Sequence, residues 1–162
     1  MNQRHYDDML ALTLAQMSGD TNRLFLRLLS SRLKECCEGN TYAVLYYNDL
    51  LTGFVRWTPD GHTMIMDALV IADDYRGQGH LMDLWAKFLD KCGEAGAKEI
   101  TSYISRDNHL SISLHENLGF YRLGNPGEKQ EQWVYKLSDK ATQSAQYHRL
   151  LWLRQPDFEG EL

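Results

Sequence analysis

Two glycines between an apolar segment and a helical pattern form the part of this sequence best suited to chemistry. The segment Arg76-Gly77-Gln78-Gly79-His80 follows an apolar run and precedes residues with helical spacing. The first N–H groups of a helix have no acceptor within the helix, and the helix dipole is positive at that end. Glycines leave these groups uncovered, so the segment predicts a site for an anion, above all a phosphate. A plain connecting turn is the alternative, because short glycine motifs also occur by chance.

Asp67 is a single carboxylate inside the apolar segment 63–71. An ionised carboxylate is costly to bury without a partner, so we expect Asp67 to face a wet cleft or a polar partner. In a cleft, such a carboxylate is a candidate functional group. The alternative is a structural ion pair or hydrogen bond.

The elements that position these residues follow from the hydrophobic pattern. The nearly unbroken apolar run 63–71 predicts a strand buried on both faces. Apolar residues from Leu81 to Cys92 recur at the spacing of one helix face. A second strand is predicted over 98–105, and a strand, helix and strand in this order favour a parallel pair with a right-handed crossover.

The rest of the chain predicts a mixed α/β sheet with helices on both faces. Two helices come first, the second ending near 38–40, and strands 41–47, 51–58 and 63–71 form an antiparallel meander. A helix that begins at 106–108 and ends at Gly119 precedes a last strand at 132–137. Residues 1–138 are expected to form the domain. We expect 139–162 to be an extension with a short helix and a loose tail, docked on the domain or on a second copy in a homodimer.

Two segments resemble motifs of the GCN5-related N-acetyltransferase (GNAT) superfamily. The glycine segment resembles its acyl-CoA pyrophosphate loop, Q/R-x-x-G-x-G/A, through Arg76 and Gly79, whereas Leu81 replaces the last small residue. The segment 108–120 resembles the pattern N-x-x-A-x-x-L-Y-E-x-x-G-F. Its matching residues are Asn108, Leu114, Glu116, Gly119 and Phe120.

This resemblance implies a GNAT fold that uses acetyl-CoA as the acyl donor and needs no metal. The pyrophosphate would bind the amides of 77–81 beside the charge of Arg76, and the pantetheine would lie along the backbone of 69–71. The asparagine at position 108 would contact the pantetheine arm or the substrate, and it also suits a helix N-cap. The implied donor-binding residues are Leu69, Val70, Ile71, Arg76, Gly77, Gln78, Gly79, His80, Leu81 and Asn108.

The resemblance also implies two catalytic residues. Asp67 stands where several members place a glutamate that deprotonates the amine through a water, and His115 stands where many carry a tyrosine that protonates the leaving thiolate. An imidazole can donate a proton only when it is charged, and burial would disfavour that form. The alternative places His115 on the outer face of its helix as an ordinary polar residue, with Tyr103 and Tyr121 as the other donors.

Composition narrows the function classes. The chain has 162 residues, 43% hydrophobic and 24% charged, which is typical of one globular domain. Its net charge of −5 disfavours a broad nucleic-acid surface and suits a cationic amine. Three cysteines without a C-x-x-C pair indicate neither a disulfide framework nor a zinc site. The sequence has no apolar stretch long enough for a membrane span, so we expect a cytoplasmic protein.

We therefore predict an N-acetyltransferase that moves acetyl from acetyl-CoA to a primary amine by direct attack in a ternary complex. A small amine or a basic protein or peptide is favoured as the acceptor. Nucleic acid is disfavoured, although charged tRNA stays among the acceptors that the superfamily allows. The alternative is a non-catalytic acyl-CoA-binding or interaction module on the same fold, suggested by the replacements at Leu81 and His115.

Overall fold

The computed structural model describes residues 1–17, 22–77, 79–124 and 129–137. Gln78 and the predicted extension 139–162 lie outside the described residues. Within the described part, no helix is long and apolar enough to cross a membrane. The elements in chain order are α1 Gln3–Gln16, α2 Arg23–Gly39, β1 Tyr42–Tyr47, β2 Leu50–Asp60, β3 Thr63–Ile71, the 3-10 turn η1 Asp73–Tyr75, α3 His80–Glu94, β4 Glu99–Ser105, α4 His109–Leu118, β5 Tyr121–Gly124 and β6 Gln130–Lys136.

The strands form one six-stranded sheet in the order β1-β2-β3-β4-β6-β5. The first three strands are an antiparallel meander, and β3 and β4 are parallel. The predicted mixed sheet is thus confirmed. Two details differ: β2 continues through Pro59 and Asp60, beyond the predicted strand 51–58, and β5 was not predicted. Asn48 and Asp49 both adopt positive φ in the predicted turn between β1 and β2.

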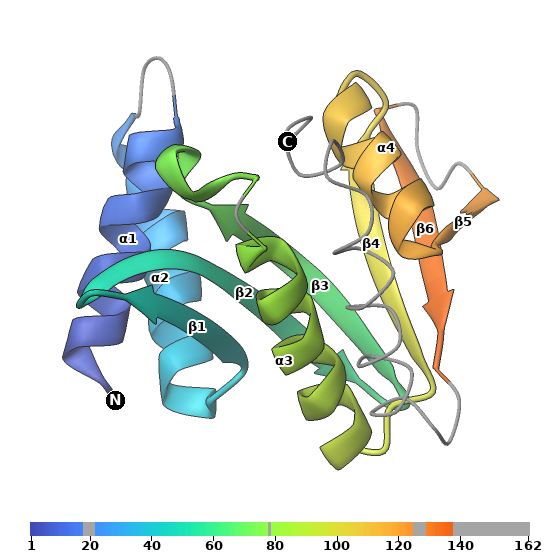
Figure 1. The fold of residues 1–162 in the computed structure, drawn as a ribbon, viewed down its shortest axis with the longest axis horizontal. Helices are drawn as coiled ribbons and strands as arrows, with labels where there is room; N and C mark the ends of the chain where they lie inside the picture. Colours follow the sequence, from blue (N-terminus) through green and yellow to red (C-terminus); the bar gives the residue numbers. More distant parts are fainter. Residues whose placement is uncertain (18–21, 78, 125–128, 138–162) are drawn as a thin grey trace.

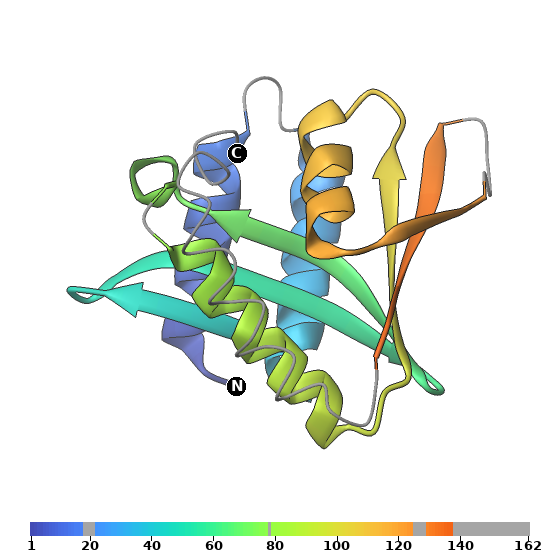
Figure 2. The same cartoon turned by 45° about the vertical axis from the view of Figure 1, so that its right-hand side comes forward.

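Helices cover both faces of the sheet. Figure 2 shows α3 and α4 in front of the sheet and α1 and α2 behind it. The front layer buries the larger core, with Trp85 and Phe88 of α3 and Leu118 of α4. The back layer buries a second core around Met9 and Leu33. This division confirms the predicted helices on both faces.

The parallel strands β3 and β4 pair over only a short distance. Their register joins Thr63–Ile65 to Glu99–Thr101 and goes no further. Figure 1 shows the two strands side by side at one end and diverging toward the other. Beyond this point β3 continues beside β2, and β4 continues beside β6. The facing edges therefore present backbone groups to the space between the strands, and buried groups of this kind require partners.

A bulge in β3 lies where the strands begin to diverge. Arg56 of β2 pairs with Ala68 and Trp57 pairs with Met66, so Asp67 is the extra residue. A bulge changes the direction of the side chains next to it. Met66 packs in the front core and Ala68 against the back core, and the alternation resumes with Leu69 in front. Asp67 therefore lies where β3 and β4 separate.

Candidate functional site

The glycine loop has the conformation that an anion site needs. Gly77 and Gly79 have φ of +82° and +83°, and a Cβ built on either would meet no atom of the described residues within 4 Å. Gly79 is the N-cap of α3 and has no side chain of its own to cap the helix start. The loop therefore leaves open space in front of the first turn of α3, where a phosphate can bind its N–H groups. These features fit the pyrophosphate of the implied donor.

The side chains next to the glycines point in different directions, some toward polar partners near the loop and one into the core. Arg76 forms an ion pair with Asp73 at 3.2 Å and donates to Gln16 Oε1 at 2.8 Å. Leu81 is 2% exposed, so the fold accommodates this larger residue by burying it under the helix. His80 turns toward Thr52, with Nδ1 3.4 Å from its hydroxyl. Only the backbone of His80 can therefore make the predicted contact with acetyl-CoA.

A groove leads from this loop into the gap between β3 and β4. It consists of two adjoining cavities of about 270 Å³ and 160 Å³, which share Leu69, Asn108, Ser111 and Leu114 as lining residues. We call them together the donor groove. The larger cavity reaches Ile71, Arg76 and Leu81, and the smaller one reaches Asp67, Ser102 and His115.

Asn108 and Val70 differ in what they bring to the donor groove. Asn108 lines both cavities and caps α4, accepting a hydrogen bond from the Ser111 N–H at 3.1 Å. The predicted N-cap is confirmed, and the contact with pantetheine stays a prediction. Val70 packs on the other face of the sheet, against the α1 and α2 core. Only its backbone is available to a ligand in the groove.

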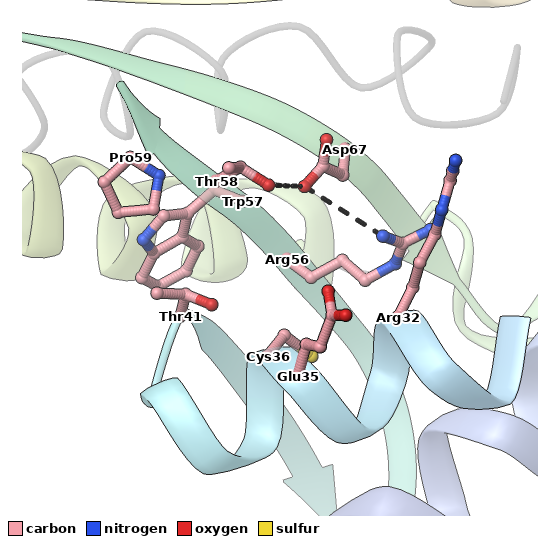
Figure 3. Close-up of a pocket in the computed structure, with 9 residues that line it drawn as sticks. All are labelled: Arg32, Glu35, Cys36, Thr41, Arg56, Trp57, Thr58, Pro59 and Asp67. Carbon is pink, nitrogen blue, oxygen red and sulfur yellow. Dashed lines mark hydrogen bonds and ion pairs between the residues drawn. The ribbon is translucent and has the colours of Figure 1, made fainter. Parts of the chain in front are cut away.

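Asp67 is held by two polar neighbours on β2. Its Oδ2 accepts a hydrogen bond from the Thr58 hydroxyl at 2.6 Å and lies 4.0 Å from Arg56 Nη1 (Figure 3). Its side chain remains 29% exposed. Asp67 lines the smaller cavity of the donor groove and also a cavity of about 380 Å³ beneath α2. We call the second cavity the α2 pocket, and Asp67 stands where it meets the donor groove.

His115 lies inside the protein and not on the outer face of α4. It is 4% exposed and packs edge-on against Phe120. Nδ1 lies 2.6 Å from the Ser111 carbonyl oxygen and Nε2 lies 2.9 Å from the Ser102 hydroxyl. The alternative that His115 is a solvent-facing polar residue is therefore wrong. His115 belongs to the face of α4 that packs into the protein, because the buried residues of this helix are Leu114, His115 and Leu118.

Burial favours the neutral form of His115. Desolvation lowers the pKa of this imidazole, and the hydrogen bond to the Ser111 carbonyl opposes the shift only partly. A carbonyl oxygen only accepts hydrogen bonds, so Nδ1 carries the proton in the neutral ring and Nε2 accepts from Ser102. Both contacts also suit the charged ring, which would donate at both nitrogens. The predicted acid role therefore depends on a form that is scarce at neutral pH.

Replacement of His115 by glutamine is expected to make the protein's stability less sensitive to acid. Since the folded pKa is lowered, the unfolded chain binds more protons between the folded pKa and the ordinary value of 6.5. Stability therefore rises with pH through this window and falls on acidification. Urea titrations at pH 7 and pH 5 should show a larger loss of unfolding free energy in the wild type than in His115→Gln. Parallel losses would contradict a lowered pKa.

Several residues of these cavities were missed by the sequence analysis. Ser102 and Arg56 are polar residues within apolar strand patterns, and both are largely buried. That pattern was the signal that could have marked them. Arg32 lies on α2. Its place in the α2 pocket depends on how α2 packs on β2, which no local pattern records. Tyr103 lines the smaller cavity of the donor groove, whereas Tyr121 lines none of the three.

The described residues contain no group of three or more histidine, cysteine or acidic residues that could hold a metal ion. The three cysteines, Cys36, Cys37 and Cys92, are buried and unpaired. Burial raises the pKa of the Cys36 thiol, which lines the α2 pocket, to about 12. This thiol is therefore protonated and a poor nucleophile at neutral pH.

Solved structures with this fold are numerous, and three of them illustrate the likeness. The PaiA N-acetyltransferase of Thermoplasma acidophilum, in complex with coenzyme A, has a TM-score of 0.69 at 12% identity over 85% of this chain and 96% of its own. The ribosomal-protein-alanine N-acetyltransferase of Brucella melitensis has a TM-score of 0.66 at 18% identity, covering 85% and 97%. Ard1 of Thermoplasma volcanium has a TM-score of 0.67 at 14% identity, covering 85% and 95%. At these identities the likeness establishes the fold.

The family follows from the sequence itself. A comparison with curated proteins found no match. The family model described as the acetyltransferase (GNAT) family matches residues 7–120, which run from within α1 past the end of α4 and therefore include the glycine loop, Asp67 and His115. This match covers more than half of the chain, and the fold agrees with it. The chain belongs to the acetyltransferase (GNAT) family.

Proposed function

We propose that the protein transfers the acetyl group of acetyl-CoA to a primary amine by direct attack in a ternary complex. The observation that carries this proposal is the position of Asp67, which lines both the donor groove and the α2 pocket. A thioester in the groove and an amine in the pocket would meet beside this carboxylate. Holding two reactants in contact in this way supplies a large part of the rate acceleration.

The donor would be held mainly by backbone groups. The first turn of α3 and the open space at Gly77 and Gly79 suit the pyrophosphate. The diverging edges of β3 and β4, which do not pair with each other beyond Ile65 and Thr101, offer hydrogen bonds to the pantetheine, which would lie between them like an added strand. Coenzyme A in the PaiA structure supports this choice of donor. Residues 69–71, 76–81 and 108 thus remain the proposed donor-binding residues.

Asp67 is proposed as the base for the acceptor. It accepts a proton from the ammonium group through a water, which frees the nitrogen lone pair to attack the carbonyl carbon of the thioester. Exposure of the side chain at 29% leaves room for that water. Thr58 donates to Oδ2 and fixes the carboxylate in position. The raised pKa of Cys36 argues against an acyl-cysteine intermediate, so direct attack is the simpler course.

His115 is proposed to supply the proton that the departing sulfur needs once the carbon–sulfur bond breaks. Its Nε2 contacts the Ser102 hydroxyl, and both residues line the donor groove. The charged ring would pass its Nε2 proton to Ser102 as the hydroxyl gives its own proton to the thiolate. Because burial lowers the pKa of His115, this contribution should decline as the pH rises toward neutrality.

The test of this function combines binding with turnover. Acetyl-CoA is titrated calorimetrically into the protein, and release of free thiol is then followed with a panel of amines and a peptide with a free N-terminus. Binding together with amine-dependent thiol release supports the enzyme. Binding without turnover on any amine would favour the non-catalytic module, and failure to bind acetyl-CoA would overturn the proposal.

A further inference from the structure

The α2 pocket has the size and charge of a site for a small zwitterion. Its volume of about 380 Å³ lies in the range of small-molecule sites. Two arginines and two carboxylates line it, Arg32 and Glu35 from α2, Arg56 from β2 and Asp67 from β3. Figure 3 shows Arg56 reaching toward Asp67, with Arg32 rising from α2 on the same side of the pocket. A ligand with one cationic and one anionic group would match this arrangement.

Arg56 is a buried cation that is incompletely neutralised. Its side chain is 13% exposed, and its ion pair with Asp67 is long, at 4.0 Å. The Thr58 hydroxyl holds the same carboxylate oxygen at 2.6 Å, which keeps Asp67 from turning fully toward the guanidinium. Burial lowers the pKa of Arg56, the charge of Asp67 opposes this shift without cancelling it, and the charge of Arg32 adds a smaller lowering. Buried charges are normally closely paired, so an anion beside Arg56 would be stabilised.

Arg32 completes a pair of guanidinium groups at the mouth of the pocket. It is exposed on α2 and comes close enough to Arg56 for their charges to repel. Guanidinium groups bind carboxylates through two parallel hydrogen bonds, and two guanidinium groups close to each other disfavour a second cation. Glu35 is exposed to solvent, which screens its repulsion of an anion held deeper in the pocket.

We propose that the acceptor is a small amine that also carries a carboxylate, as amino acids do. The amine faces Asp67 at the donor groove, and the carboxylate is bound by Arg56 and Arg32. This assignment rests on the proposed acetyl transfer, in which Asp67 receives the acceptor's amine. A polyamine would place a second cation against the two arginines and would bring no further anion to them.

The test compares amines that differ only in the carboxylate. Thiol release from acetyl-CoA is measured with the standard L-amino acids, with their carboxamides, with spermidine and with a peptide that has a free N-terminus. At least one amino acid should be acetylated with a kcat/KM about tenfold or more above that of its carboxamide, since a charge-assisted contact is lost in the amide. Equal or better use of the carboxamides, spermidine or the peptide would overturn the proposal.

Arg32→Gln provides the second arm, because Arg32 is exposed and its loss should not prevent folding. The variant should raise KM for the preferred amino acid about tenfold and leave both the affinity for acetyl-CoA and the carboxamide rate unchanged. Arg27→Gln, an exposed arginine of the same helix outside the pocket, should match the wild type. An unchanged KM in Arg32→Gln would overturn the assignment of the carboxylate. Absence of turnover with every amine would overturn the transfer reaction itself.

Discussion

Replacement of Asp67 by asparagine is expected to lower kcat for acetyl transfer by about 10²–10⁴-fold, the range for loss of a general base. Asparagine has nearly the same shape and can still accept the hydrogen bond from Thr58, but it cannot take a proton from the amine. Asp67 lies beside the expected reaction centre and away from the glycine loop. The affinity for acetyl-CoA should therefore stay near that of the wild type.

Steady-state thiol release and calorimetric titration of acetyl-CoA check this result. Asp60→Asn is the matched control, because Asp60 is an exposed aspartate near the end of the same hairpin and lines neither the donor groove nor the α2 pocket. It should retain full activity. A kcat for Asp67→Asn within twofold or so of the wild type would rule out the base role. The unfolding temperature should accompany each measurement, since Arg56 loses its counter-charge in the variant.

The elements that were predicted from sequence are those with strong local signals. Helix α3 combines a clear apolar face with a glycine at its start, and Gly119 ends α4 with a φ of +99°. Strand β5 was missed because it has four residues and all four are exposed, so neither length nor alternation marks it. Its pairing with β6 is a long-range feature that local propensity does not record.

The candidate site was predicted where it depends on backbone and missed where it depends on packing. The glycine loop and the Asn108 cap are local features, and both have the expected conformation. The burial of His115 depends on how α4 is rotated about its own axis against the sheet, which the local sequence does not give. The spacing of Leu110, Leu114 and Leu118 suggested one buried face, but Leu110 is 58% exposed and the buried face is centred nearer His115. The meeting of α2 with β2 in the α2 pocket likewise depends on tertiary structure.

Replacement of Gly79 by tryptophan is expected to weaken acetyl-CoA binding on the order of 100-fold or more, as the loss of charge-assisted contacts to a phosphate predicts. Among the residues that the structure describes, none has an atom within 4 Å of a Cβ at this position, so the indole would extend into the space in front of α3. That space is where the pyrophosphate would bind the helix N-terminus. The tryptophan would therefore block the pyrophosphate of acetyl-CoA without a clash in the protein core.

Backbone strain is the competing cause of such a loss, since a side chain at a φ of +83° is itself unfavourable. Gly96→Trp is the matched control, because Gly96 has a φ of +69°, is equally open and follows the far end of α3. Similar unfolding temperatures for the two variants, with acetyl-CoA binding lost only in Gly79→Trp in calorimetry, would assign the loss to the loop. Normal binding by a folded Gly79→Trp variant would show that the donor's phosphates bind elsewhere, even though the fold and the family are unchanged.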